Sequence, residues 1–205
     1  RDKAAEGREW WGGVGGGVRG AAEALYAVGP AGFSSAAARC VYRVKVQVRC
    51  NGAQSRGGGI DSAHSSSLHS SDRPPARVDG AKATGTVWPR PSTDKAPRLQ
   101  LQQTPFGFRY AAIRRPIANS ATHDYIRVTL FQAPFTVHIP PNNLYNLSIL
   151  HIPQDDTNTC FYFVAWSDTG PGIDAEAWRK FCGAQVGIDL DAKYRKFRTR
   201  DNSYL

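Results

Sequence analysis

Two imidazoles and a carboxylate lie within nine residues of one another in the stretch GGGIDSAHSSSLHSSD, residues 57–72. Asp61 precedes His64 by three positions, and His69 follows His64 by five. Imidazole and carboxylate ligands together suit a mid-series divalent metal, and two histidines with one carboxylate leave open positions for oxygen and substrate at a non-haem Fe(II). Spacing alone leaves two interpretations open: a metal site, or a serine-rich polar loop that carries imidazoles.

Helix geometry restricts how the two imidazoles can meet. At about 100° per residue, side chains five apart on a regular helix point roughly 140° apart. His64 and His69 can therefore converge on one ion only if the helix widens, ends or bends between them. The run Ser65–Ser67 permits this, because serine hydroxyls compete for backbone partners. Asp61 and His64 face the same way, so a carboxylate at 61 is placed to hold the second nitrogen of a ligand imidazole.

The elements that must position these side chains are mostly strands. Alternating or β-branched and aromatic patterns predict strands over 41–48, 106–115, 125–140, 144–153 and 159–167. QDDTN, residues 154–158, is a turn of the hairpin kind. Residues 60–70 permit a helix, and 71–104, with five prolines, predict a long irregular crossing. Asp174 is a plausible N-cap for an amphipathic helix over 174–185, packed on the sheet by Trp178 and Phe181. The order of elements gives an α+β class.

The remaining histidines and the acidic residues near the C-terminus receive structural interpretations. We expect the histidines to be exposed or hydrogen-bonded residues of the sheet, and His138, within FTVHIPP, is also a candidate for lining a pocket. We expect the acids to be a helix cap, solvated positions and surface pairs, and not metal ligands. The histidines are His123, His138 and His151, and the acids are Asp174, Asp189, Asp191 and Asp201.

Composition limits the class of protein. The chain has 205 residues, of which 41% are hydrophobic, enough for one ordinary domain with a sizeable core. It has no run of about 18 apolar residues and no apolar signal core at its start, so we predict neither a membrane span nor a secreted protein. Its four cysteines, at 40, 50, 160 and 182, form no CxxC or CxH pair. This favours a reduced, cytoplasmic protein without a disulfide framework, a zinc site or an iron–sulfur site.

The formal net charge of +9 raises the question of nucleic-acid binding. Residues 1–50 hold eight lysines and arginines against three acids, whereas the other 155 residues carry only +4. More than half of the net charge therefore lies in the first 50 residues. Residues 1–40 form a glycine-rich segment that shows no stable period and is expected to be disordered or non-native. We predict no nucleic-acid partner.

Residues 41–205 resemble the catalytic domain of a Rieske non-haem iron ring-hydroxylating oxygenase α subunit, of the phthalate 4,5-dioxygenase-like branch. The Asp-x2-His-x4-His motif of that family is reproduced by Asp61, His64 and His69. Further matching stretches are FGFRYAAIRRP (106–116), IPPNNLYN (139–146), FYFVAW (161–166) and WRKFCGAQVGIDLDAKYRKFRTRDNSYL (178–205).

The resemblance implies a fold, a set of roles and partners. The fold is a helix-grip (START/Bet v 1-like) antiparallel sheet wrapped by helices, incomplete here, with iron at the inner end of an apolar pocket. His64 and His69 are implied as Fe(II) ligands, and Asp61 as the bridging carboxylate that passes an electron from the Rieske cluster of a neighbouring subunit. The implied reaction inserts oxygen from O2 into an aromatic substrate, with electrons from an NAD(P)H-dependent reductase. The complete protein is expected to be a homo-oligomer of the trimer type.

Two parts of that family pattern are expected outside this chain. The Cys-x-His and Cys-x2-His ligands of a [2Fe–2S] Rieske cluster are absent from the sequence, and the carboxylate that completes the iron triad normally lies downstream of the RDNSYL segment, 200–205. We therefore expect the chain to be inactive alone. The alternative from another class is a helix-grip module that binds a small molecule without redox activity.

Overall fold

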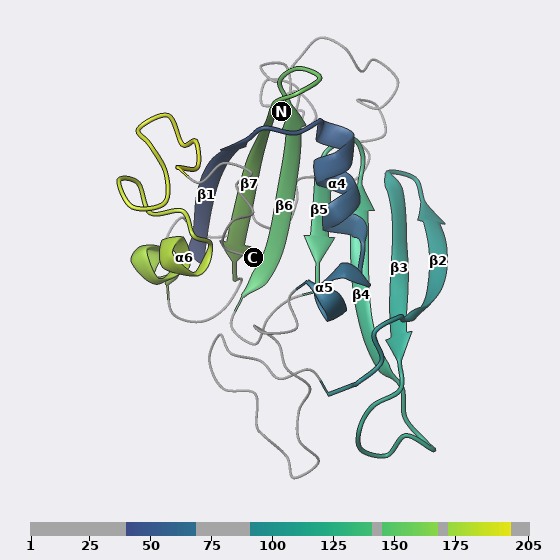
Figure 1. Ribbon diagram of the computed structural model, residues 1–205. Coiled ribbons are helices and arrows are strands. Elements are labelled where there is room, and N and C mark those ends of the chain that lie inside the picture. The colour runs from purple at the N-terminus through teal and green to yellow at the C-terminus, as the bar shows by residue number, and fades with distance from the viewer. Residues whose placement is uncertain (1–39, 69–90, 141–144, 168–171, 198–205) are drawn as a thin grey trace, which may run out of the picture.

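A computed structural model describes residues 40–68, 91–140, 145–167 and 172–197. Its centre is one antiparallel sheet of seven strands in the order β1-β7-β6-β5-β4-β3-β2 (Figure 1). The strands are β1 (Val41–Val48), β2 (Arg98–Thr104), β3 (Gly107–Arg114), β4 (Tyr125–Gln132), β5 (Thr136–Ile139), β6 (Asn146–Pro153) and β7 (Thr159–Trp166). The helices are α4 (Gly52–Ile60), α5 (His64–Ser67) and α6 (Ala175–Phe181). The predicted α+β class is confirmed.

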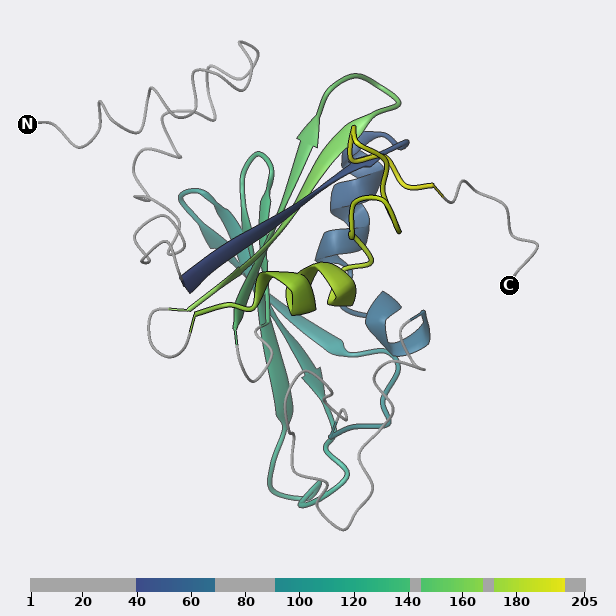
Figure 2. The same cartoon turned by 90° about the vertical axis from the view of Figure 1, so that its left-hand side faces the viewer.

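The topology is an open meander to which the first strand is added at the far edge. Strands β2 to β7 follow one another as neighbours, and β1 returns to pair with β7 from Val41 opposite Trp166 to Val48 opposite Thr159. Antiparallel neighbours need only short turns, as from β2 to β7, whereas the connection from β1 to β2, which contains α4 and α5, runs from one edge of the sheet to the other. The helices are left free to pack on one face, and Figure 2 shows α4 and α6 on the same side of the sheet.

The main hydrophobic core lies between the sheet and α6. Trp178 of α6 is 2% exposed and packs on Phe163, with ring centroids 5.0 Å apart. The same cluster contains side chains from β1, β6, β7 and the segment after α6: Val44, Val46, Leu147, Ala165, Ala184 and Leu190. Burying a set of this size is what holds a short helix such as α6 against the sheet.

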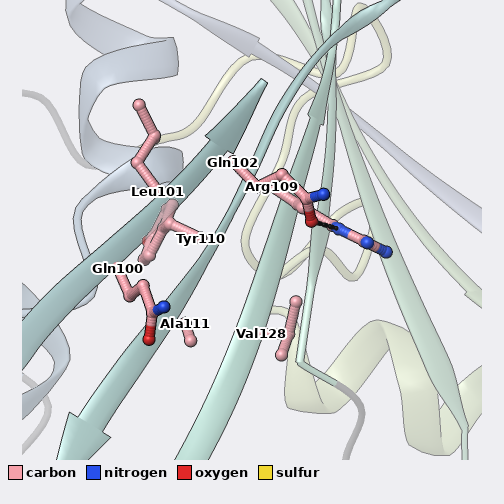
Figure 3. A pocket seen from close by; sticks show the side chains of 7 residues that line it. All are labelled: Gln100, Leu101, Gln102, Arg109, Tyr110, Ala111 and Val128. Carbon is pink, nitrogen blue, oxygen red and sulfur yellow. Dashed lines mark hydrogen bonds between the residues drawn. The ribbon is translucent and has the colours of Figure 1, made fainter. Parts of the chain in front are cut away.

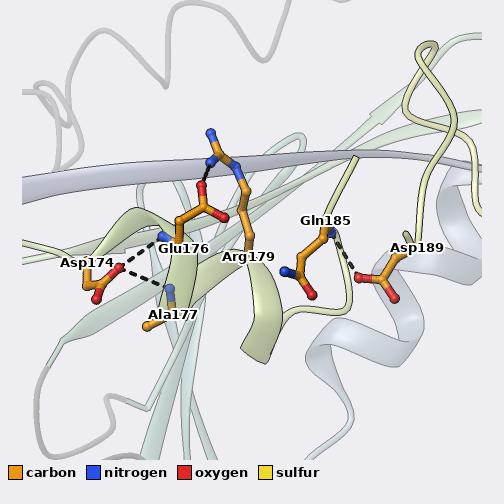
Figure 4. A network of polar contacts seen from close by, with 6 residues as sticks. All are labelled: Asp174, Glu176, Ala177, Arg179, Gln185 and Asp189. Carbon is orange, nitrogen blue, oxygen red and sulfur yellow. Dashed lines mark hydrogen bonds and ion pairs between the residues drawn. The ribbon is translucent and has the colours of Figure 1, made fainter. Parts of the chain in front are cut away.

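Helix α6 begins where the sequence predicts. The Asp174 carboxylate accepts hydrogen bonds from the backbone N–H groups of Glu176 and Ala177, both at 3.0 Å, and Arg179 pairs with Glu176 (Figure 4). The helix is shorter than the predicted 174–185 and ends at Phe181. Phe181 stacks on Trp178 but is 46% exposed, so the prediction that it packs on the sheet is wrong. Asp174 already satisfies the first turn, and Gly183 at φ 55° ends the helical path.

Helix α4 is a feature that the sequence did not predict. Its sequence GAQSRGGGI holds four glycines and has low intrinsic helix propensity. External contacts compensate. The Asn51 side chain caps Ala53 N–H at 2.8 Å, Ser55 Oγ lies 2.7 Å from His151 Nδ1 on β6, and Arg56 donates to the Pro134 carbonyl at 2.7 Å. The helix is thus held by tertiary contacts with the sheet rather than by its own sequence.

Two of the strand boundaries also differ from the prediction. Residues 98–104, assigned to the irregular crossing, form β2 because they pair with β3 along its length. The predicted strand 125–140 is divided into β4 and β5 by a tight turn that contains the cis Ala133–Pro134 bond. A proline there cannot donate to a ladder, so a continuous central strand is excluded. The hairpin turn at 154–158 is confirmed, with Asp155 accepting bonds from Thr157 and Asn158.

Of the predicted glycine-rich segment 1–40, only Cys40 is among the described residues. Of the predicted irregular crossing 71–104, residues 71–90 lie outside them. The boundary at residue 40 therefore stays a prediction. All four cysteines are free thiols in the structure, and burial raises the pKa of the Cys182 thiol to about 12. Within the described ranges, none of the helices has both the length and the apolar character that a membrane span requires.

Candidate metal centre

The Asp61 backbone lies at the junction between α4 and α5. It is the C-cap of α4, with an extended backbone at φ −69° and ψ 109°. Its carboxylate turns toward α5, where it accepts the N–H of Ala63 at 2.7 Å and of His64 at 3.2 Å. The side chain therefore ends one helix and organises the start of the next, as an Asx residue does at a helix N-terminus.

His64 is held in one tautomer by its backbone neighbour. Its Nδ1 makes a short contact with the carbonyl oxygen of Asp61. A carbonyl can only accept, so Nδ1 must carry the proton, and in a neutral imidazole Nε2 is then the unprotonated nitrogen, the type of atom that binds a metal. The sequence analysis expected the Asp61 carboxylate to do this, but the carboxylate is engaged by the two N–H groups and the carbonyl takes its place.

The described part of the motif ends one residue after helix α5. Helix α5 has four residues, ends at Ser67 and is followed by the C-cap Leu68, which is 76% exposed and has a helical backbone at φ −78° and ψ −29°. His69 itself lies outside the described residues, so its convergence with His64 stays a prediction.

Strand β3 supports this segment from the sheet. The Tyr110 hydroxyl donates to the carbonyl of Ile60, and Ser62 Oγ lies 2.9 Å from the same hydroxyl. Because tyrosine has one hydroxyl proton, Ser62 is the donor in the second bond. Arg114 Nη2 donates to the Ser62 carbonyl at 2.9 Å and to Ser66 Oγ at 3.3 Å. Residue types did not point to either side chain, because each lies about 50 positions away from the motif.

The donors present suit a ferrous ion without completing a site. Among the described residues no group of three or more His, Cys, Asp or Glu side chains gathers around one point. His64 supplies a nitrogen whose tautomer fits a metal, and nitrogen with carboxylate oxygen is the donor set that non-haem iron takes. The fit is therefore that of one ligand with its orienting partner.

Two of the other histidines are hydrogen-bonded residues of the sheet, as predicted, His138 to other strands and His151 to helix α4. Trp166 Nε1 donates to Ser148 Oγ at 3.1 Å, which leaves the serine proton for His138 Nδ1 at 2.9 Å, and His138 Nε2 pairs with Gln132 at 3.2 Å. Burial lowers the pKa of His138. His151 is 1% exposed and bonds Ser55 through Nδ1, whereas its Nε2 is buried without a partner.

His123 and the acids after α6 also agree with the structural interpretations. His123 is exposed and bonds Thr122. Asp189 accepts the Gln185 N–H at 2.9 Å (Figure 4), and Asp191 pairs with Arg195 at 2.7 Å. Hydrogen bonds from the Arg195 backbone are the main cause that lowers the pKa of Asp191. Asp201 lies outside the described residues.

A hollow of about 420 Å3 lies at the β2 end of the sheet (Figure 3). Its lining mixes polar and apolar side chains, and the Arg109 side chain donates to Gln102 at 2.7 Å. Strand register places Arg109, Ala111 and Val128 on the face opposite Tyr110. Neither His64 nor His138 lines this hollow, so it is not the apolar iron pocket that the resemblance implies.

The chain is an α+β protein in which Asp61 and His64 lie at two helices that pack beside an antiparallel sheet. Comparison with known proteins gives its family. Residues 19–205 match the family described as "LigXa C-terminal domain like", and the chain belongs to that family. The chain is 58% identical, over 161 residues, to the phthalate 4,5-dioxygenase oxygenase subunit of Pseudomonas putida. This confirms the resemblance stated from the motifs. The match covers 78% of this chain but 37% of that relative, so the chain spans little more than a third of its length.

Solved structures give a weaker likeness. The quaternary ammonium Rieske monooxygenase CntA, in complex with an inhibitor, overlaps 70% of this chain and 33% of its own, at 12% identity and a TM-score of 0.42. At this score the overlap carries no argument about the fold or the function of the chain.

Proposed function

We propose that the chain is the catalytic-domain part of an aromatic ring-hydroxylating oxygenase that uses O2 at a mononuclear non-haem Fe(II). The observation that carries the proposal is the contact between His64 Nδ1 and the Asp61 carbonyl, which makes Nε2 the unprotonated nitrogen of a neutral ring. The high identity to a phthalate 4,5-dioxygenase oxygenase subunit supports the same reaction class.

Each residue of the motif has a role in this proposal. His64 and His69 hold the ferrous ion, which when bound supplies the site for O2 activation. The Asp61 carbonyl orients the His64 ring. The Asp61 carboxylate orders the start of α5 through two N–H bonds, and it is the group through which an electron would arrive from the Rieske cluster of a neighbouring subunit.

The proposal extends to the parent protein. It would carry a [2Fe–2S] Rieske cluster, receive electrons from an NAD(P)H-dependent reductase, assemble as a trimer-type homo-oligomer and act on an aromatic small molecule in the cytoplasm. The chain alone is then expected to bind iron without turnover, because it lacks the cluster ligands.

Anaerobic Fe(II) titration of the purified chain tests the proposal. We expect the unmodified chain to bind one Fe(II). The affinity should be at least about tenfold weaker in His64→Ala and in His69→Ala, since each removes one nitrogen ligand. His123→Ala is the matched control, because that histidine is exposed and distant in sequence from the motif, and it should bind as the unmodified chain does.

Three results would contradict the iron site. Uptake that is equal in all three variants would show that the two imidazoles are not ligands. Binding of an aromatic compound that is indifferent to both substitutions, with no iron uptake, would favour the small-molecule binding module. Salt-sensitive DNA binding that disappears when residues 1–50 are removed would favour the nucleic-acid binder.

A further inference from the structure

Two buried side chains of β3 make hydrogen bonds to the segment that contains Asp61 and His64. Tyr110 is 5% exposed and Arg114 is 4% exposed. Tyr110 contacts the carbonyl of Ile60, the residue before Asp61. Arg114 bonds the carbonyl of Ser62 and the hydroxyl of Ser66, which is fully buried. The contacts therefore lie on both sides of Asp61 and His64 and involve neither the Asp61 carboxylate nor the His64 ring.

Arg114 also reaches the chain beyond the motif. Its Nε donates to the carbonyl of Asp94 at 3.2 Å, and the Asp94 carboxylate accepts the Arg115 N–H at 2.6 Å. One guanidinium thus joins Ser66 to Asp94, the two sides of a stretch that contains His69. The same side chain therefore holds the segment that carries His64 to the described chain at Asp94.

Helix α5 needs such support. It has four residues, and a helix of this length is unstable in water without tertiary contacts. A guanidinium offers five N–H donors in a fixed plane, so it can serve three acceptors in two directions, which a lysine ammonium on its flexible stem cannot do in the same geometry. Buried bonds of this kind hold their partners firmly because an unpaired group there is unfavourable.

We propose that Arg114 is a positioning residue for the metal-binding segment, with Tyr110 as its second support: together they fix Asp61 and His64 against the sheet. This inference rests on the proposed function, because the segment is a metal-binding one only if that function holds. Neither side chain touches the ion in this proposal.

The test uses Arg114→Lys and Tyr110→Phe in the full chain, each with two readouts. Hydrogen exchange of the backbone amides over 62–68, without metal, reports the order of the segment. Anaerobic Fe(II) titration reports the site. We expect faster exchange over 62–68 with little change in β6 and β7, and Fe(II) affinity about 10- to 100-fold weaker, which is the range typical of lost outer-shell support.

Two controls separate positioning from general stability and from charge. Arg109→Lys makes the same substitution on the same strand, but Arg109 is exposed and its side chain donates to Gln102 on β2, away from the motif, so both readouts should stay unchanged. Val44→Ala weakens the core beneath α6, far along the sheet from β3, and should lower stability while leaving the Fe(II) affinity as it was.

The failures of the two proposals can be told apart. An unmodified chain that takes up no Fe(II) contradicts the proposed function. Exchange over 62–68 that is unchanged in both β3 variants overturns the positioning role whether or not iron binds. Faster exchange with unchanged affinity also overturns it, because Arg114 would then be a structural residue only. If Arg114→Lys does not fold, Tyr110→Phe, which removes one oxygen atom, decides.

Discussion

At the scale of single residues, His151 couples the stability of the fold to pH. Burial first, and the positive Arg56 second, lower its pKa from 6.5 to about 4. Below pH 6.5 the imidazole binds a proton in the unfolded chain, whereas in the folded chain it stays neutral until about pH 4. The stability that neutral His151 contributes is therefore present above pH 6.5 and is lost as the pH falls. A difference of this size corresponds to about 3 kcal/mol when the loss is complete. Urea unfolding between pH 7 and 4.5 should show this loss in the unmodified chain, and a smaller one in His151→Gln, which does not titrate.

A second substitution shows whether the effect belongs to the buried ring. His123 is exposed, so His123→Gln should keep the full pH dependence of the unmodified chain. Equal slopes in His151→Gln and the unmodified chain would mean that His151 does not carry the acid sensitivity, and His138, whose pKa burial also lowers, would be the next candidate.

The candidate site could be predicted only in part from residue types. Asp61, His64 and His69 stand in one short stretch, so their spacing carries a recognisable motif. Tyr110 and Arg114 act from 48 to 52 positions away, and nothing local in FGFRYAAIRR indicates which side chains face a helix. The backbone carbonyl of Asp61, and not its carboxylate, holds His64 Nδ1. This depends on the break between α4 and α5, which the composition of the stretch does not indicate.

At the scale of elements, the glycines of α4 record how closely this helix lies on the sheet. A Cβ built on Gly59 would stand 2.6 Å from His151 Nε2, whereas one on Gly58 meets nothing within 4 Å. Gly58→Ala should raise the free energy of unfolding by about 0.5–1 kcal/mol, because alanine loses less conformational freedom in a helix. Gly59→Ala should instead lower it by about 1–3 kcal/mol, since a buried ring must move. Denaturant unfolding of the two variants checks both signs, and stabilisation by both would disprove the close approach.

Elements were predictable where local pattern and tertiary contacts agree. Strands β1, β3, β6 and β7 and the start of α6 follow alternation, turn residues and a cap. Helix α4 and strand β2 do not, because GAQSRGGGI is a poor helix former and RLQLQQT follows a proline-rich stretch. Helix α4 forms because it packs against β5 and β6, and strand β2 forms because it pairs with β3. Tertiary contacts override weak local propensity in both cases.

At the scale of the whole molecule, the two edges of the sheet differ. The β1 edge is partly covered, since Gln47 forms a bridge to Arg195 in the segment after α6. Strand β2 forms the other edge, where no further strand of the described residues pairs with it, and Leu99 and Leu101 are 60% and 62% exposed. An exposed apolar edge strand is a template for pairing with another chain.

This asymmetry predicts that the chain associates through β2 as its concentration rises. Leu101→Lys places a charge on the edge and should reduce concentration-dependent light scattering, because a second strand would have to bury the ammonium. Gln100→Lys adds the same charge to the neighbouring position on the opposite face, so it separates the loss of the apolar side chain from the gain in net charge. Equal suppression by both variants would attribute the effect to charge alone, and no suppression by either would place the association elsewhere on the molecule.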